Sequence, residues 1–225
     1  MPWSEWMRTV EVEPSLAGAD LSRLGEQIEA LLRASCRVFH LDVGDGHFAE
    51  RVTIGTTVLQ SISALIHRYG GVIDVHLMVE SPAAYFEAVR TAGGDSVTFH
   101  YEAVDDVEAT IRAAREQKLQ VGIAFNPETE PKDVAAVANG VDVVLCMAIH
   151  PGYAGQPARE GTFDRVRELR GLLDDRIYIQ VEGGVNDENI KQLYDDGARL
   201  LVAGSAIFAR EDLPRAYRRL VQALA

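Results

Sequence analysis

The sequence predicts a (β/α)8 TIM barrel of the α/β class. Eight short runs rich in β-branched and apolar residues alternate with amphipathic stretches along all 225 residues. The composition does not shift along the chain and no linker interrupts it, so we expect residues 1–225 to form a single barrel domain. A doubly wound open sheet is the alternative. Eight regular units are long for that class, and no Gly-x-Gly-x-x-Gly turn follows the first strand.

Each predicted strand is a run of four to seven residues bounded by turn or helix signals. In chain order the strands are Thr9–Glu13, Val38–Val43, Val72–Met78, Ser96–His100, Gln120–Phe125, Asp142–Met147, Ile177–Glu182 and Leu200–Ala203. The amphipathic stretches that follow them predict helices over Leu21–Arg33, Thr56–Tyr69, Ala83–Ala92, Val104–Gln117, Lys132–Ala138, Thr162–Leu173, Asn189–Asp196 and Leu213–Leu224. Ser81-Pro82 is typical of a helix start and Gly197 of a helix end.

Charge and composition restrict the partners. The chain has 22 Lys and Arg against 34 Asp and Glu, a net charge of −12. This balance argues against a nucleic acid or an anionic membrane, although backbone N–H groups can still hold a phosphorylated substrate. The apolar runs are too short to span a membrane, and residues 1–8 have no secretion signal pattern. Cys36 and Cys146 are expected to be free thiols, so we expect a cytoplasmic protein.

Metal-binding side chains recur at the predicted ends of three strands. His40 and Asp42 are two residues apart and so point to one face of their strand. His76 ends the third strand and Glu182 ends the seventh. Strand ends share one face of a barrel, so these residues are predicted to converge. Two imidazoles and two carboxylates suit one divalent metal ion, and Zn, Mn, Fe and Co remain open.

Each of these residues also has a simpler interpretation. A histidine at a strand end is often a hydrogen-bonded structural residue, and Asp42 could cap the following loop. Glu182 could be a solvated strand end. The coincidence of four such residues favours a site. Two carboxylates on opposite sides of a substrate can remove a proton beside a ketone and return it on the other face. A metal would polarise the carbonyl and stabilise the enediolate charge.

Glycine-rich segments after the last three strands predict a phosphate site and a lid. Gly183-Gly184 and Gly204-Ser205 follow strands seven and eight, where this fold usually binds phosphate, and Ser205 could start a short helix. Residues 151–156 resemble a mobile lid. Tight turns and an ordinary surface loop are the alternatives. Met78 and Met147 either fill gaps in the core or form an apolar floor beneath the substrate.

The chain resembles the ribulose-phosphate 3-epimerase family almost from end to end. The likeness is carried by Pro14-Ser15-Leu16, His40–Val43, Asp45–Phe48, Thr53–Gly55, Asp74–Val79, Thr98–His100, Pro151–Gln156, Glu182–Val185 and Gly204–Ile207. The resemblance implies a ribulose-phosphate-binding barrel, a homo-oligomer and a small phosphorylated ketose as substrate. It implies reversible epimerisation at C3, converting D-ribulose 5-phosphate to D-xylulose 5-phosphate.

The resemblance also implies a role for individual residues. Asp42 and Glu182 would be the two acid/base groups, and His40, Asp42, His76 and Glu182 would ligate the metal. The residues implied to bind the substrate are Ser15, His76, Met78, Met147, Gly152, Tyr153, Ala154, Gly155, Gln156, Gly183, Gly184, Gly204 and Ser205.

Three positions depart from the family pattern. The family has Asp where Glu182 stands, Met where Gly44 stands and Gly where Ala154 stands. The glutamate is expected to shift its carboxylate by over an ångström. Gly44 is expected to open space beside the metal and loosen the loop, and Ala154 to stiffen the lid.

These departures keep other functions open. The chain could act on another ketose phosphate such as allulose 6-phosphate, or bind a sugar phosphate without turnover. An aldolase or decarboxylase on the same barrel is disfavoured, because Asp74–Met78 lacks the lysine of an Asp-x-Lys-x-x-Asp pattern. None of Lys118, Lys132 and Lys191 lies at a predicted strand end, which also disfavours a Schiff base.

Overall fold

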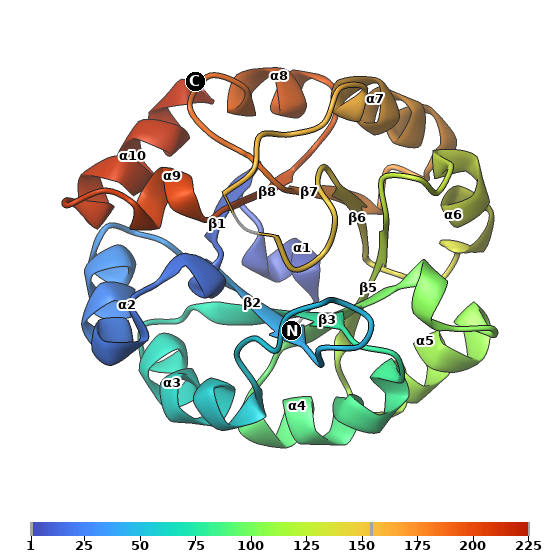
Figure 1. Cartoon of the computed structure of the whole chain (residues 1–225), viewed down its shortest axis with the longest axis horizontal. Helices are drawn as coiled ribbons and strands as arrows, with labels where there is room; N and C mark the ends of the chain where they lie inside the picture. Colours follow the sequence, from blue (N-terminus) through green and yellow to red (C-terminus); the bar gives the residue numbers. More distant parts are fainter. Residues whose placement is uncertain (1, 154, 225) are drawn as a thin grey trace.

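The computed structural model describes residues 2–153 and 155–224 and shows a ring of helices around a central sheet (Figure 1). The eight strands are β1 Glu11–Pro14, β2 Val38–Gly44, β3 Val72–Met78, β4 Ser96–His100, β5 Gln120–Phe125, β6 Val143–Met147, β7 Tyr178–Glu182 and β8 Leu200–Ala203. All neighbouring strands pair in parallel, in the order β1-β8-β7-β6-β5-β4-β3-β2. A parallel bridge between Ser15 and His40 joins β1 to β2, so the sheet forms the predicted (β/α)8 barrel.

The helices lie outside the barrel and begin close to their predicted positions. They are α2 Leu24–Arg33, α3 Thr56–Arg68, α4 Phe86–Ala92, α5 Val107–Glu116, α6 Pro131–Val137, α7 Thr162–Leu172, α8 Ile190–Asp195 and α10 Leu213–Ala223, with two short helices, α1 Trp3–Trp6 and α9 Ser205–Phe208. Short 3-10 turns are η1 Leu16–Gly18, η2 Leu21–Arg23, η3 Pro82–Tyr85 and η4 Tyr101–Ala103. Ser81 precedes η3, which has Pro82 at its start, and Gly197 has a φ of +118° just after α8.

Strand β1 begins two residues later than predicted. Its partner β8 starts at Leu200, which pairs with Glu11. The N–H of Glu11 donates to the carbonyl of Arg199, the residue just before β8, so the pairing begins at Glu11 and not at Thr9. The β-rich pattern predicted the strand, but the partner strand fixed where it begins.

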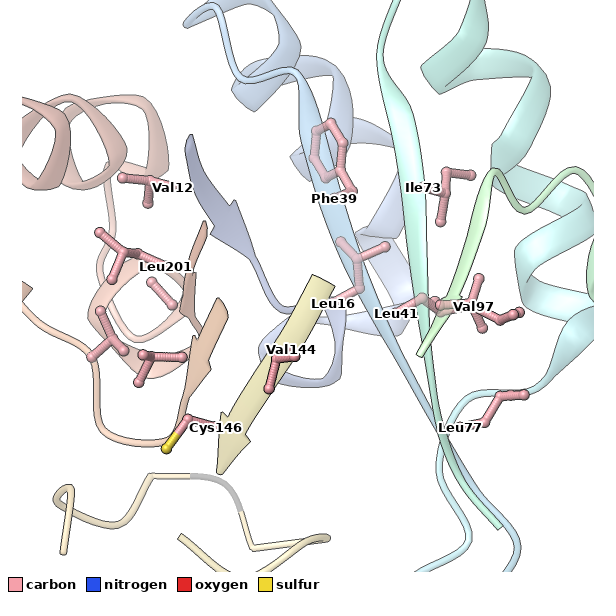
Figure 2. Close-up of a cluster of buried hydrophobic side chains, with 14 of the residues drawn as sticks. Val12, Leu16, Phe39, Leu41, Ile73, Leu77, Val97, Val144, Cys146 and Leu201 are labelled. Atoms are coloured by element: carbon pink, nitrogen blue, oxygen red, sulfur yellow. The ribbon is translucent and has the colours of Figure 1, made fainter. Parts of the chain in front are cut away.

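The two faces of each strand have different surroundings. Outward side chains such as Val12, Phe39, Leu41, Val97 and Leu201 pack against the helices in the main hydrophobic core (Figure 2). Inward side chains at the starts of β2, β3, β6 and β8 are also apolar, whereas further along β1, β2, β3, β4 and β7 the inward side chains are polar and buried. These buried polar residues include Glu13, His40, Asp42, Asp74, His76, His100 and Gln180. The barrel interior is therefore the place where buried polar groups must find partners.

Helix α1 covers the end of the barrel where the strands begin. The indole rings of Trp3 and Trp6 are buried and lie edge to face, with centroids 4.9 Å apart. They pack against Val38, Val72 and Leu200, which are inward residues at strand starts. Helix α1, which was not predicted from the sequence, therefore closes this end of the barrel. The carboxyl ends of the strands form the accessible end.

None of the helices in the described part of the chain is long and apolar enough to cross a membrane.

Candidate metal centre and active site

The four predicted ligands meet at the carboxyl ends of β2, β3 and β7. The parallel register places Asp42 beside His76, and Glu182 is the last residue of β7. Nδ1 of His76 lies 3.1 Å from Oδ1 of Asp42 and 3.0 Å from Oε2 of Glu182. Nε2 of His40 lies 3.3 Å and 3.5 Å from the same two oxygens. Each residue thus offers one atom to a common point, and these atoms lie within 4.8 Å of one another.

This geometry fits a divalent cation. Ligands about 2.1 Å from one tetrahedral metal ion lie roughly 3.4 Å apart, close to the separations found here. Both histidines are fully buried, and the side chains of Asp42 and Glu182 are 4% and 16% exposed. Nε2 of His40 and Oε2 of Glu182 are buried without a hydrogen-bond partner, although both face the cluster. Unpaired lone pairs that converge in a dry site are typical of metal ligands.

The cluster requires positive charge. Burial raises the pKa of the Asp42 carboxyl, but the charges and hydrogen bonds of His40 and His76 outweigh it and lower that pKa. Burial lowers the pKa of His76, yet the carboxylates of Glu182 and Asp42 raise it to about 9. Burial and the nearby charge of Asp42 raise the pKa of Glu182, but its charge and hydrogen-bond interactions with His76 and His40 outweigh them and lower that pKa. A divalent cation would supply the positive charge and release the imidazole protons.

A buried polar layer lies under His40. Its Nδ1 is 3.0 Å from Oδ2 of Asp74 and 3.6 Å from Oε2 of Glu13, and the amide of Gln180 donates to both carboxylates. Burial raises the pKa of Glu13 to about 7. Sequence reasoning gave these residues no role. The available signal was the strand period, because Asp74 and Gln180 lie two residues before His76 and Glu182 and so share their inward face.

A second set of partners lies behind His76. Its Nε2 is 2.8 Å from Nε2 of His100, and Nδ1 of His100 is 3.3 Å from Oε2 of Glu102. Burial lowers the pKa of His100 to about 4, so this imidazole is neutral. Burial raises the pKa of Glu102, but hydrogen bonds from His100, Thr129 and the N–H of Asn126 lower it overall. His100 had been identified only as part of a family motif, without a role.

Two adjoining cavities lie above the cluster. The smaller, about 60 Å³, is lined by Ser15, Asp42, Met78, Met147, Gly152, Tyr153 and Glu182, among others. The larger, about 300 Å³, is lined by Gly155, Gly183, Gly184, Gly204 and Ser205, among others. Ser15, Ile149 and Glu182 line both cavities. Gln156 lies in a neighbouring hollow beside Gly184 and Ser205, and Ala154 lies outside the described residues.

The glycines of the larger cavity differ in how much room a side chain would have. Gly184 has a φ of +69°, and a Cβ there would lie 2.3 Å from the backbone nitrogen of Ala158. The loop after β6 therefore packs directly on the loop after β7. A Cβ on Gly204 would lie 3.9 Å from the Cβ of Ser15, an ordinary contact, so this position has room for a small side chain. Helix α9 starts at Ser205, as predicted, and its first N–H groups have no partners within the helix.

The expectation for Gly44 is wrong. The position opens no space, because a Cβ there would lie 2.5 Å from the carbonyl oxygen of Arg51. The loop is not loosened either. The N–H of Gly44 donates to Oγ1 of Thr53, and that hydroxyl donates to the carbonyl of Asp42, at 2.6 Å each. The missing side chain instead allows the loop after β2 to fold tightly onto the strand end.

Comparison with known families and proteins gives matches that cover nearly the whole chain. The model of the ribulose-phosphate 3 epimerase family matches residues 11–208. Ribulose-phosphate 3-epimerase from Escherichia coli K12 is 37% identical over 211 residues, which cover 92% of each chain. The Bacillus subtilis enzyme of that name is 33% identical and covers 92% of this chain and 96% of its own length. Ribulose-phosphate 3-epimerase 2 from Cupriavidus necator is 34% identical, with coverage of 96% and 92%.

Solved structures with lower identity show the same fold. The 3-hexulose-6-phosphate synthase from Salmonella typhimurium has a TM-score of 0.73 at 18% identity and covers 95% of this chain and 98% of its own. Orotidine 5'-phosphate decarboxylase from Pyrococcus horikoshii has a TM-score of 0.72 at 16% identity, with the same coverage. These two likenesses concern the barrel only. The family model and the curated relatives cover nearly the whole chain, and the chain belongs to the ribulose-phosphate 3-epimerase family.

Proposed function

We propose that this epimerase-family enzyme interconverts D-ribulose 5-phosphate and D-xylulose 5-phosphate with the help of one divalent metal ion. The observation that carries the proposal is the placement of Asp42 and Glu182. They lie on β2 and β7, both face the same pair of imidazoles, and both line the 60 Å³ cavity. Two carboxylates in one small cavity can exchange a proton with both faces of the same carbon.

In this mechanism Asp42 and Glu182 alternate as base and acid. One carboxylate removes the proton from C3 of the ketose, and the other delivers a proton to the opposite face, which inverts that centre. A bound divalent cation would polarise the adjacent carbonyl and offset the negative charge that develops on its oxygen. The hydroxyl of Ser15 donates to Oδ2 of Asp42 at 2.7 Å, which orients that carboxylate toward the cavity.

Apolar side chains limit the access of water to the reacting carbon. Met78 and Met147 are buried and line the small cavity below the substrate position. Gly152 and Tyr153, from the loop after β6, line the same cavity, and the Tyr153 hydroxyl bonds to Glu50 in the loop after β2. The two loops therefore meet above the site. Excluding water would protect the deprotonated intermediate and strengthen the electrostatic interactions.

The phosphate would occupy the larger cavity. Gly183, Gly184, Gly204 and Ser205 line it, and backbone N–H groups at the start of α9 can donate to an anion. The cavity adjoins the small one through Ser15 and Glu182, so one extended substrate can reach both. This arrangement explains how a chain of net charge −12 can hold a phosphate ester.

A second candidate is epimerisation of another ketose phosphate, such as allulose 6-phosphate. Glu182 favours it, because a glutamate reaches one methylene further into the cavity than the aspartate of the family pattern. The site cavity would then suit a substrate placed differently above the cluster. A sugar-phosphate-binding protein without turnover is the remaining alternative.

One experiment separates these functions. Protein purified without chelators is analysed for bound metal and incubated in D₂O with ribulose 5-phosphate, allulose 6-phosphate and fructose 6-phosphate in turn. We expect about one equivalent of a divalent metal and deuterium uptake at C3 of ribulose 5-phosphate, abolished by chelator and restored by added metal. Faster uptake with allulose 6-phosphate would favour the second candidate. Ligand-induced thermal stabilisation without uptake from any ketose would refute both.

A further inference from the structure

The structure shows which ring nitrogen of His76 faces the metal cluster. Nδ1 lies 3.1 Å from Asp42 and 3.0 Å from Glu182, whereas Nε2 points away and lies 2.8 Å from Nε2 of His100. His40 is turned the other way, with Nε2 toward the cluster and Nδ1 toward Asp74. The two imidazoles therefore need opposite tautomers to present their lone pairs to the same cation.

The hydrogen bonds behind His76 are compatible with a metal ion on its Nδ1. Nδ1 of His100 is 3.3 Å from Oε2 of Glu102, and a carboxylate can only accept. Nδ1 of His100 therefore donates to Glu102. The 2.8 Å contact between the two Nε2 atoms holds one proton, so one ring donates and the other accepts. With a cation on Nδ1 of His76, the proton of that ring lies on Nε2 and is donated to His100. The hydrogen bonds that run from His76 through His100 to Glu102 thus suit the tautomer that a metal ligand needs.

Several contacts hold His76, His100 and Glu102 in place. Glu102 is in η4, directly after β4, where Oε1 accepts from the N–H of Asn126 at 2.7 Å and from the hydroxyl of Thr129. The rings of His76 and His100 are stacked with centroids 5.0 Å apart. The ring of Phe48 also packs against His100, with centroids 4.6 Å apart. Each ring can therefore neither rotate nor flip without losing contacts.

We propose that His100 and Glu102 are positioning residues that fix Nδ1 of His76 as a metal ligand. Neither residue lines the two cavities that would hold the substrate, so both act through His76. The proposal rests on the proposed metal site. Partners that orient a metal-binding imidazole typically change metal affinity or activity by about 10–100-fold when they are removed.

The main test compares two substitutions of His100. In His100→Gln the amide oxygen can accept from Nε2 of His76 while the amide N–H₂ donates to Glu102, so the direction of the hydrogen bonds is kept. His100→Leu has neither group. We expect His100→Leu to weaken Zn²⁺ binding by about 10–100-fold and His100→Gln to recover most of the loss. Zn²⁺ affinity is measured by competition with a chelator, and the Co²⁺-loaded protein reports the ligand geometry through its visible spectrum.

Two further variants complete the test. Glu102→Ala removes the hydrogen-bond acceptor of His100. A folding defect is less of a concern at this position because the side chain of Glu102 is partly exposed. This variant should weaken Zn²⁺ binding and lower kcat while KM for the ketose phosphate stays within twofold. His67→Gln is the matched control, because His67 also pairs with a carboxylate, Asp95 at 2.9 Å, but lies on the exposed face of α3. Its metal affinity should equal that of the wild type.

The outcomes separate this inference from the proposed function. Nitrogen-15 NMR of the Zn²⁺-loaded wild type should show the proton of His100 on Nδ1 and that of His76 on Nε2. A wild type that binds no divalent metal would refute the proposed function and this role together. A wild type that binds metal tightly, with unchanged affinity and Co²⁺ spectrum in folded His100→Leu and Glu102→Ala, would overturn this inference alone. So would a proton on Nε2 of His100.

Discussion

Asp42 and Glu182 face the same two imidazoles from different strands, but they are held in different ways. Asp42 lies within β2, next to the long β2–β3 pairing, with Ser15 on one oxygen and His76 on the other. The backbone carbonyl of Asp42 accepts a hydrogen bond from the hydroxyl of Thr53. Glu182 ends β7, is four times as exposed, and has an oxygen without a hydrogen-bond partner. Gly183 and Gly184, with φ of +114° and +69°, follow it directly.

Two carboxylates with equivalent chemistry are thus held in place to different degrees. Asp42 is fixed before a ligand arrives, because its two oxygens and its carbonyl have partners in a dry interior. Glu182 has one more rotatable bond and fewer partners, so the protein itself constrains its orientation less. Substitutions on the Asp42 side should therefore disturb the site more than matched substitutions on the Glu182 side.

The largest effect is expected for Asp42→Asn. The variant alters the proposed base and metal ligand and removes the negative charge that His40 and His76 face. We expect kcat to fall on the order of 10⁴-fold, the upper end for loss of a general base. Deuterium uptake at C3 measures it, with circular dichroism as a check on folding. Loss of less than tenfold would mean that Asp42 does not exchange the proton.

Glu182 gives the next largest effects. Glu182→Gln should lower kcat by about 10²–10³-fold, less than Asp42→Asn, because a general base typically contributes about 10²–10⁴-fold. Glu182→Asp keeps the charge but withdraws the carboxylate by over an ångström, so we expect a loss of about 10-fold, and up to about 100-fold for a displacement of that size. The same uptake assay ranks the three variants. A gain in rate for Glu182→Asp would show that the glutamate is suited to another ketose phosphate.

Removing the hydroxyl that orients Asp42 should have a moderate effect. In Ser15→Ala the carboxylate loses its donor at 2.7 Å. We expect kcat to fall on the order of tenfold, since a hydrogen bond to a charged group is worth about 1.5–3 kcal/mol. Ser61→Ala is the control, because Ser61 bonds only to the Val58 carbonyl on the exposed side of α3. Equal kinetics for both variants would contradict the view that Asp42 is fixed in advance.

The smallest effect concerns the backbone beside Asp42. Thr53→Val removes a hydroxyl that joins the Gly44 N–H to the Asp42 carbonyl. We expect the free energy of unfolding to fall by about 1–3 kcal/mol, because a part-buried donor and acceptor lose their partner. Urea unfolding measures this loss. The exposed Thr91→Val on α4 should change stability by less than about 0.5 kcal/mol. Similar values for the two variants would show that the loop after β2 is not anchored at Thr53.

Local patterns in the sequence predicted most of the architecture. The bounds of β3, β4, β5 and β8 are those predicted, because their apolar runs end at clear turn signals. The convergence of His40, Asp42, His76 and Glu182 also followed from strand position alone. Helix α1 was missed, since four residues with two tryptophans carry no helical period.

Other features of the site could not be predicted from local sequence patterns. Glu13, Asp74 and Gln180 belong to separate strands, and each by itself is an ordinary polar residue. Their shared role under His40 appears only when the barrel closes and their atoms come within hydrogen-bond distance. Gly44 gave a misleading signal, because the group that fills its space, the Arg51 carbonyl, comes from a loop whose path the sequence does not fix.

The strand period, the inward position of the polar residues and the family can all be read from the order and type of neighbouring residues. Three other properties depend on the folded barrel: which nitrogen of each histidine faces the cluster, which carboxylate is fixed in advance, and how the loop after β2 folds onto its strand. These properties depend on distances of about 3 Å between atoms from different strands, and such distances exist only once packing has fixed the curvature and closure of the barrel.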